Sequence, residues 1–410
     1  MSDGKKVSNN IIMLYILNIT QLILPLVTLP YLTRVLSVSS YGVVSYVKSI
    51  MMYVTLLIEF GYILSGTKQV VEAKGDKEEL GKIVGTITQG KLLLSLFALC
   101  ILLMMIFFIP ILRNNYLFTL LSFIPSFLTI FLCDYLFRGL ERMQVVSIRY
   151  LIMKGISTIL TFVFIKSDKQ LILIPVLDIF GTLIAIAWIF NEIKHMGLHI
   201  SFSKRNRVIS SLKSSFIYFA SDMASTAFGA FNTFCVGIFL SARSVAFWGV
   251  IMSIITAAQS MFSPISDGIY PRMIDKKSIR LFIKIILFFM PFLIIGAFVT
   301  YYGSELIILI IGGAKYKSAA IYLREFIPLI IISFFSITCG WPLLGAINKE
   351  KEMTFTTIFT AILQVVGVLL LIVTNNFTIP SLIVVRTMTE LVLAILRVYF
   401  SVKYRYLFNG

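Results

Sequence analysis

Single basic residues stand inside long apolar stretches of this sequence, and their side chains could bind an anion within a membrane. A charge in bilayer hydrocarbon is costly unless it faces water, a partner or a ligand. Lys48 and Lys91 have no carboxylate three or four residues away, so a local ion pair does not explain them. Arg34 stands at the end of the first apolar stretch. We expect Arg34, Lys48 and Lys91 to line a water-filled cavity that attracts phosphate, because low-dielectric walls focus the field.

Lys154 and Arg386 complete the basic residues that we predict to bind substrate. For each of the two residues, the sequence also allows a role other than substrate binding. Lys154 can extend its amine along the helix to the membrane surface. Arg386 lies four residues before Glu390 on the same helix face, so the two side chains can form a local ion pair.

Three carboxylates in the apolar stretches are candidates for binding a coupling cation, either H⁺ or Na⁺. Asp178 and Asp222 fall nearest the middle of their predicted spans, and Glu390 is the third candidate. Carboxylates inside a membrane are rare and typically mark ion pathways or proton relays. Pairing with a lysine is the alternative for Asp178 and Asp222.

No motif for enzyme chemistry, a cofactor or a metal occurs, and we expect no catalytic residue. His195 and His199 have metal-binding spacing, but no further ligand stands nearby, which favours a solvated loop. A nucleotide-binding Gly-rich loop, a GxSxG nucleophile and an HExxH site are all absent. The four cysteines have no paired spacing, which indicates neither a disulfide framework nor a zinc site.

Composition indicates a protein with many membrane spans. Hydrophobic residues make up 58% of the 410 and charged residues 13%, and apolar runs long enough to cross the bilayer recur throughout. The net charge of +17 lies in short connections, which argues against nucleic-acid binding. We predict twelve helices, over residues 11–35, 41–64, 83–109, 116–137, 148–165, 170–191, 214–240, 245–268, 281–302, 321–345, 354–374 and 380–402.

The distribution of basic residues predicts the orientation. Of the 36 Lys and Arg residues, 23 fall in connections on the side of the N-terminus and 8 on the opposite side. Basic connections stay in the cytoplasm, so we expect both termini there.

A basic connection at 191–213 divides six predicted spans from six. A shift of 204 residues aligns Leu36 and Ser37 with Leu240 and Ser241. We therefore predict two six-helix bundles, residues 1–200 and 201–410, arranged as a parallel repeat with the substrate site between the halves.

The first two spans resemble a known family. The runs LPLVTLPYLTRVLSVSSYG and EFGYILSGTKQV are similar to the start of bacterial polysaccharide flippases, the Wzx-type O-antigen and capsule translocases. These belong to the superfamily that includes the multidrug-and-toxin extruders. The run IGGAKYKSAAIYLR, Ile311 to Arg324, resembles the second half of that family.

The resemblance implies a V-shaped pair of six-helix bundles in the bacterial cytoplasmic membrane. It also implies that an undecaprenyl-pyrophosphate-linked oligosaccharide moves to the outer leaflet through a cationic cavity, coupled to an ion gradient. The expected partners are this lipid-linked substrate, the bilayer, the coupling cation and other polysaccharide assembly proteins.

Three alternatives remain open at this point. A multidrug antiporter shares the fold, but many carry an aspartate in the first span, and this chain has no carboxylate between Ile11 and Leu36. A flippase for the peptidoglycan precursor would usually have two extra helices. A membrane polymerase or ligase needs a large extracytoplasmic loop, and the longest one predicted here covers residues 301–319.

Overall fold

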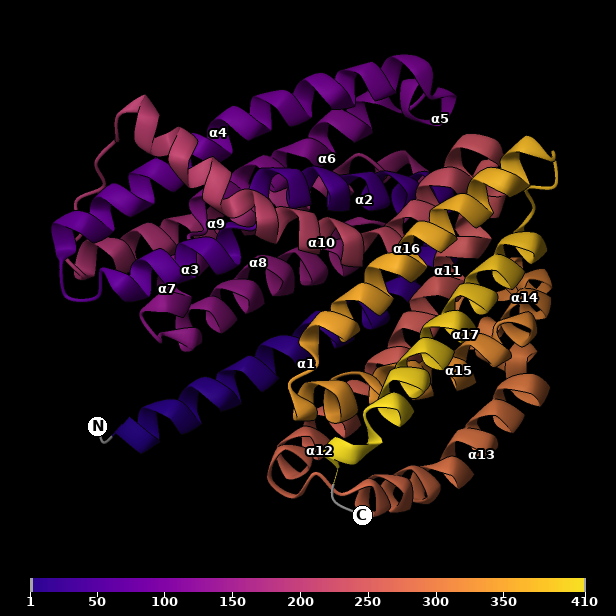
Figure 1. The fold of residues 1–410 in the computed structure, drawn as a ribbon. Coiled ribbons are helices and arrows are strands. Elements are labelled where there is room, and N and C mark those ends of the chain that lie inside the picture. The colour runs from indigo at the N-terminus through magenta and orange to yellow at the C-terminus, as the bar shows by residue number, and fades with distance from the viewer. Residues whose placement is uncertain (1–2, 409–410) are drawn as a thin grey trace. The chain divides into compact units, whose positions relative to one another are not determined.

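The computed structural model describes the backbone of residues 3–408 and the side chains of residues 13–408 except 221, 224, 225, 227–229, 267 and 271. Every element in this part of the chain is helical (Figure 1). The chain divides into two compact units, Met1–Met223 and Ala224–Gly410. The boundary falls inside helix α10 (Arg205–Phe239) rather than in the connection before it.

Among the described residues, the first unit contains nine α-helices and the first part of α10. They are α1 (Asp3–Val35), α2 (Val38–Glu59), α3 (Tyr62–Glu72), α4 (Lys77–Phe108), α5 (Pro110–Arg113), α6 (Tyr116–Leu128), α7 (Asp134–Gly139), α8 (Met143–Phe164) and α9 (Leu173–His195).

The second unit contains the rest of α10 and seven further helices. They are α11 (Ala242–Ser260), α12 (Ser263–Lys276), α13 (Ile279–Ile311), α14 (Ala320–Glu325), α15 (Ile327–Thr338), α16 (Glu350–Val373) and α17 (Ile379–Lys403). A π-helical turn, Gly340–Leu344, follows α15.

Eleven helical segments in the described part are long and apolar enough to cross a membrane. Three of them join two short helices each: α2 with α3, α6 with α7, and α11 with α12. The span predicted over 214–240 falls in α10, whose apolar stretch among the described side chains is Ala230–Phe239. The predicted fold class, an all-helical protein with many membrane spans, is confirmed.

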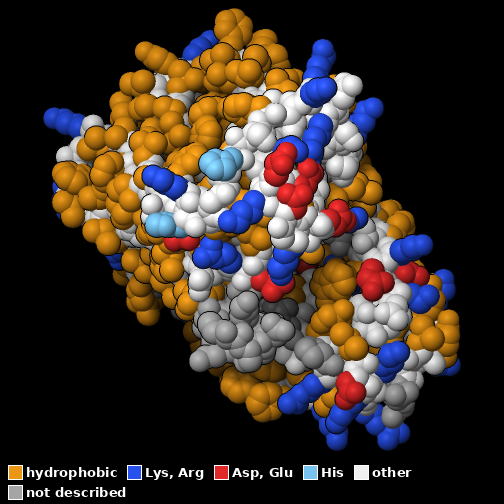
Figure 2. All heavy atoms as spheres, turned by 90° about the vertical axis from the view of Figure 1, so that its left-hand side faces the viewer, with side chains coloured by type: hydrophobic (Ala, Val, Ile, Leu, Met, Phe, Trp, Pro, Cys, Tyr) orange, Lys and Arg blue, Asp and Glu red, His pale blue; other side chains and the backbone are white. Residues whose placement is uncertain are grey.

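The surface carries apolar side chains suited to lipid. On α4, Leu96, Phe97, Phe107 and Phe108 are between 59% and 71% exposed. Exposed apolar area of this kind marks contact with a membrane or a partner. Figure 2 shows hydrophobic side chains beside a region where Lys, Arg, Asp, Glu and both histidines gather. His195 and His199 are exposed, as predicted for a solvated loop.

Two serines begin equivalent helices in the predicted repeat. The Ser37 side chain accepts a hydrogen bond from the Ser40 backbone N–H at the start of α2. The Ser241 side chain accepts one from the Ser244 backbone N–H at the start of α11. Serine at this position pairs an otherwise unbonded N–H group and ends the preceding connection. The alignment of Ser37 with Ser241 therefore places residues with one structural role opposite each other.

The connection that precedes α10 packs along α4 instead of lying free. At Gly81 and Gly85, a Cβ atom would overlap the backbone carbonyls of His199 and Ser201, respectively. The backbone N–H of Ser203 donates to the side chain of Gln89 over 2.8 Å. Two glycines thus form a groove on α4 that receives this segment.

The helix of the second span breaks at Phe60 and Gly61, which separate α2 from α3. Their φ angles of 45° and 71° lie in the left-handed region, where glycine is favoured. The α10 backbone passes directly over this break. A Cβ atom at Gly61 would lie 2.6 Å from the backbone nitrogen of Phe219. The Phe60 and Phe219 rings stack with centroids 4.6 Å apart.

We expect Gly61→Ala to lower the thermal unfolding midpoint of the purified protein by several degrees. The left-handed conformation alone costs roughly 1–2 kcal/mol for a residue with a Cβ atom, and the overlap with α10 adds to this. Gly155→Ala is the matched control, because no atom lies within 4 Å of its Cβ position. Equal midpoints for both variants would contradict the proposed close contact at Gly61.

Candidate functional site

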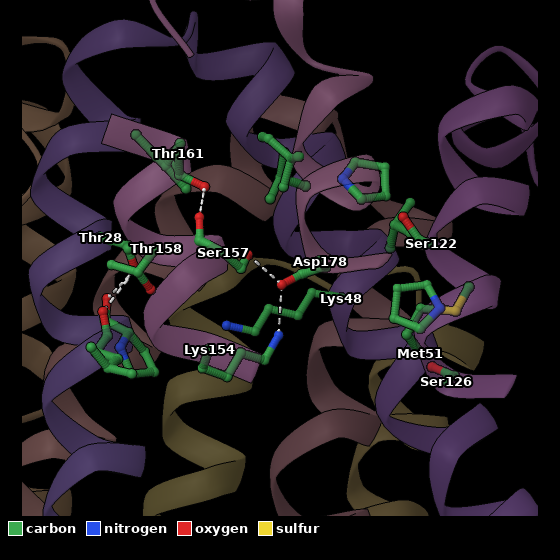
Figure 3. A pocket seen from close by; sticks show the side chains of 18 of the residues that line it. Thr28, Lys48, Met51, Ser122, Ser126, Lys154, Ser157, Thr158, Thr161 and Asp178 are labelled. Atoms are coloured by element: carbon green, nitrogen blue, oxygen red, sulfur yellow. Dashed lines mark hydrogen bonds and ion pairs between the residues drawn. The ribbon is translucent and has the colours of Figure 1, made fainter. Parts of the chain in front are cut away.

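A cavity of about 370 Å³ lies within the first unit, between α1, α2, α6, α8 and α9 (Figure 3). Its volume is within the range of small-molecule sites. Half of the residues that line it are apolar, and the other half carry hydroxyl or charged groups. These polar residues are Thr28, Lys48, Ser122, Ser126, Tyr150, Lys154, Ser157, Thr158, Thr161 and Asp178.

The polar lining of α8 follows from helical spacing. Lys154, Ser157, Thr158 and Thr161 stand at positions i, i+3, i+4 and i+7, which share one face of a helix. This spacing is visible in the sequence, although only the lysine of this set is among the predicted site residues. A search for polar residues at helical period inside apolar spans would have found the hydroxyls as well.

Prolines shape two walls of the cavity. Pro25 lies inside α1 and Pro125 inside α6, and both line the cavity. Each removes one helical hydrogen bond and bends or loosens its helix. The Thr28 hydroxyl donates to the backbone carbonyl of Leu24, 2.9 Å away. Loosened helices of this kind are tolerated in a membrane where neighbours or a water-filled cavity satisfy the freed backbone groups.

Three charged side chains meet in the cavity. The Lys154 Nζ atom lies 2.9 Å from Oδ1 of Asp178, and the Ser157 hydroxyl donates to the same oxygen over 2.7 Å. Lys48, from α2, is exposed to the cavity and has no hydrogen bond or ion pair with the described residues. Figure 3 shows Lys48, Lys154 and Asp178 close together. The lining therefore contains two positive charges and one negative charge.

Arg34 does not line this cavity. It is exposed in the last turn of α1, and its Nη1 atom donates to the backbone carbonyl of Pro30 over 2.9 Å. A basic side chain in this place interacts favourably with the negative end of the helix dipole. The structure thus separates Arg34 from Lys48, although the sequence analysis placed them in one cavity.

Lys91 also lies outside the cavity, in a buried ion pair. Its Nζ atom is 2.6 Å from Oε2 of Glu59, and the Lys91 side chain is only 2% exposed. The amine lies over the Tyr135 ring, 5.5 Å from the centroid. A second pair, Arg149 with Asp134, has a separation of 2.7 Å. Local spacing does not predict the partner of Lys91, because Glu59 is on a different span.

The remaining predicted residues lie in other places. Arg386 and Glu390 form the local ion pair that their spacing predicts, 2.8 Å apart and almost fully buried in the second unit. The Ser336 hydroxyl donates to Glu390 as well. Asp222 is partly exposed on α10 and does not line the cavity. The structure therefore brings Lys48, Lys154 and Asp178 together in one cavity, and Arg34, Lys91 and Asp222 of the same unit do not line it.

The fold of the chain is similar to that of solved transporters. The lipid II flippase MurJ, in an inward closed conformation, matches with a TM-score of 0.68 and 16% identity over 96% of this chain and 87% of that chain. A multidrug resistance transporter of the MATE family, in an inward-facing conformation, matches with a TM-score of 0.65 and 11% identity over 94% and 98%. At these identities the likeness shows the fold alone.

Sequence comparisons give closer relatives. A protein of Shigella dysenteriae named "Putative O-antigen transporter" is 25% identical over 87% of this chain and 90% of its own length. One of the same name from Escherichia coli K12 is 24% identical over 87% of each. The family described as "Polysaccharide biosynthesis protein" matches residues 7–277, about two thirds of the chain. The chain belongs to this polysaccharide biosynthesis family, as the resemblance of its first two spans predicts.

Proposed function

We propose that this protein moves a lipid-linked oligosaccharide, carried on undecaprenyl pyrophosphate, across the bacterial cytoplasmic membrane. One observation carries the proposal: a cavity inside the membrane-spanning first unit contains two lysines against a single carboxylate. A pyrophosphate cannot cross hydrocarbon without cationic partners. The names of the two relatives support a polysaccharide repeat as the cargo.

In this proposal Lys48 and Lys154 bind the pyrophosphate. Lysine offers a point charge on a flexible stem, which can follow a moving phosphate. The hydroxyls of Ser157, Thr158 and Thr161 donate to phosphate or sugar oxygens from one face of α8. Alternating access of the cavity to the two sides of the membrane would then move the head group.

A multidrug antiporter is the second candidate, because one similar solved structure is a multidrug transporter. The net positive charge of the cavity lining disfavours it, since such antiporters export organic cations and an opposite charge favours binding. Uptake of a cationic dye into vesicles, dependent on Asp178 as the only carboxylate among the described residues that line the cavity, would favour the antiporter.

The coupling cation, H⁺ or Na⁺, is proposed to bind one of Asp178, Asp222 and Glu390. Asp178 and Glu390 pair with Lys154 and Arg386, so a cation there would have to replace a basic side chain. Neutralising each carboxylate in turn tests the idea. Transport that stays dependent on the ion gradient in all three variants would reject it.

We also propose that both termini lie in the cytoplasm, from the excess of basic residues in the connections on that side. Reporter fusions after Asn115 and at Gly410 should therefore report opposite compartments. The same compartment for both would reject this topology.

The decisive experiment is genetic and chemical. A strain that lacks this protein should lose its surface polysaccharide and accumulate lipid-linked repeat units on the cytoplasmic side. Expression of the wild-type chain should restore both. Normal lipid-linked intermediates combined with altered drug resistance would contradict a flippase.

A further inference from the structure

The site on α8 already holds an anion in this structure, and the anion is a side chain of the protein itself. One oxygen of Asp178, Oδ1, accepts from both the Lys154 amine at 2.9 Å and the Ser157 hydroxyl at 2.7 Å. An amine and a hydroxyl three residues apart are also suitable donors for a phosphate oxygen. Asp178 therefore occupies the position that the substrate's phosphate needs.

Lys48 differs from Lys154 in this respect. It reaches the same cavity from α2, and no carboxylate of the described residues lies within ion-pair distance of its amine, although Asp178 attracts it at longer range. The unpaired lysine is available for the first contact with an arriving phosphate. The second contact, at Lys154 and Ser157, requires Asp178 to move away, because the single donor of the Ser157 hydroxyl is already used and two anions side by side repel each other.

We propose that Asp178 is an internal competitor of the substrate's phosphate for Lys154 and Ser157. The inference rests on the proposed function and adds a role for the carboxylate. Asp178 holds the Lys154 amine in place when the site is empty, and it returns to this amine when the phosphate leaves. Without the competitor, two lysines would bind the pyrophosphate tightly and release it slowly, which would limit transport.

This role differs from that of a carrier of the coupling cation. A carrier would need Asp178 to exchange a proton or sodium ion, and its loss would abolish the dependence on the ion gradient. A competitor acts through its negative charge and its access to Lys154. Its removal tightens the binding of the substrate and slows its release.

The test uses the full chain in lipid nanodiscs and undecaprenyl diphosphate as the probe. We expect Asp178→Asn to bind the probe at least tenfold more tightly and to release it more slowly. Asp178→Glu, which keeps the charge, should stay within threefold of wild type. Glu141→Gln is the matched control, since it removes an exposed carboxylate outside the cavity. Asp178→Ser is a second neutral variant if Asp178→Asn fails to fold.

A double-mutant cycle separates competition from a general change in charge. In a Lys154→Met background, the gain in affinity from Asp178→Asn should be at least threefold smaller than in the wild-type background, because the contested amine is gone and only the Ser157 hydroxyl and the removed charge contribute. An equal gain in both backgrounds would overturn the competition. A neutral variant that binds no more tightly than wild type would overturn it too.

The same experiment distinguishes failure of this inference from failure of the proposed function. If Lys154→Met weakens binding of the diphosphate and neutral variants at Asp178 do not strengthen it, only the competition is wrong. If the wild-type protein binds undecaprenyl diphosphate no better than uncharged undecaprenol, the cationic site and the competition are both wrong.

Discussion

The double variant Lys48→Ala, Lys154→Ala is expected to lose at least 100-fold of the transport activity while the protein stays in the membrane at a normal level. Hydrogen bonds to charged groups contribute about 1.5–3 kcal/mol each. Loss of both lysines therefore removes roughly 3–6 kcal/mol of phosphate binding, and each 1.4 kcal/mol corresponds to about tenfold. Accumulation of lipid-linked repeat units in a deletion strain that carries the variant measures the loss.

Two control variants test whether the loss of transport comes from the positive charges in the cavity. The variant Lys48→Arg, Lys154→Arg keeps both charges and should retain much of the activity. Lys169→Ala with Lys351→Ala removes two exposed lysines outside the cavity and should behave as wild type. Full production of surface polysaccharide by a normally expressed double alanine variant would defeat the proposed phosphate site.

Lys91→Met should strongly destabilise the protein. The Lys91 side chain is 2% exposed and that of Glu59 19%. Removal of one partner of a buried ion pair leaves the other charge uncompensated, which typically costs about 3–5 kcal/mol. We expect little folded protein in the membrane and a clearly lower unfolding midpoint in detergent.

The double variant Lys91→Met, Glu59→Gln should recover most of this loss, because no unpaired charge remains. A recovered protein that transports normally would identify Lys91 as structural. A recovered protein without transport would instead support the substrate-binding role that the sequence predicts for Lys91. A single Lys91→Met variant as stable as wild type would contradict the importance of the pair.

The sequence predicts the membrane class well because charge is costly in hydrocarbon and apolar length is easy to read. The same cost makes Lys48 and Lys154 stand out, and the cavity contains both. Arg386 and Glu390 are predicted as a pair because helix geometry relates positions four apart. For Arg386 and Glu390, local spacing in the sequence is enough to predict the contact.

Contacts between spans are not visible in local spacing. Lys91 is paired by Glu59, which lies 32 residues away along the chain and directly before the break at Phe60. Arg34 stands only 14 residues before Lys48 in the sequence, yet its side chain does not line the cavity, although Leu32 in the same helical turn does. A single sequence, read by itself, contains no information on which residues of different helices are in contact.

The groove on α4 concerns biosynthesis as well as the finished fold. Residues 199–203 fit against Gly81 and Gly85, and both glycines leave the ribosome more than a hundred residues earlier than this segment. Since domains generally form in the order of their synthesis, the groove can be complete when its occupant emerges. When the rest of the chain is synthesised, it therefore continues from a segment that is already packed against α4.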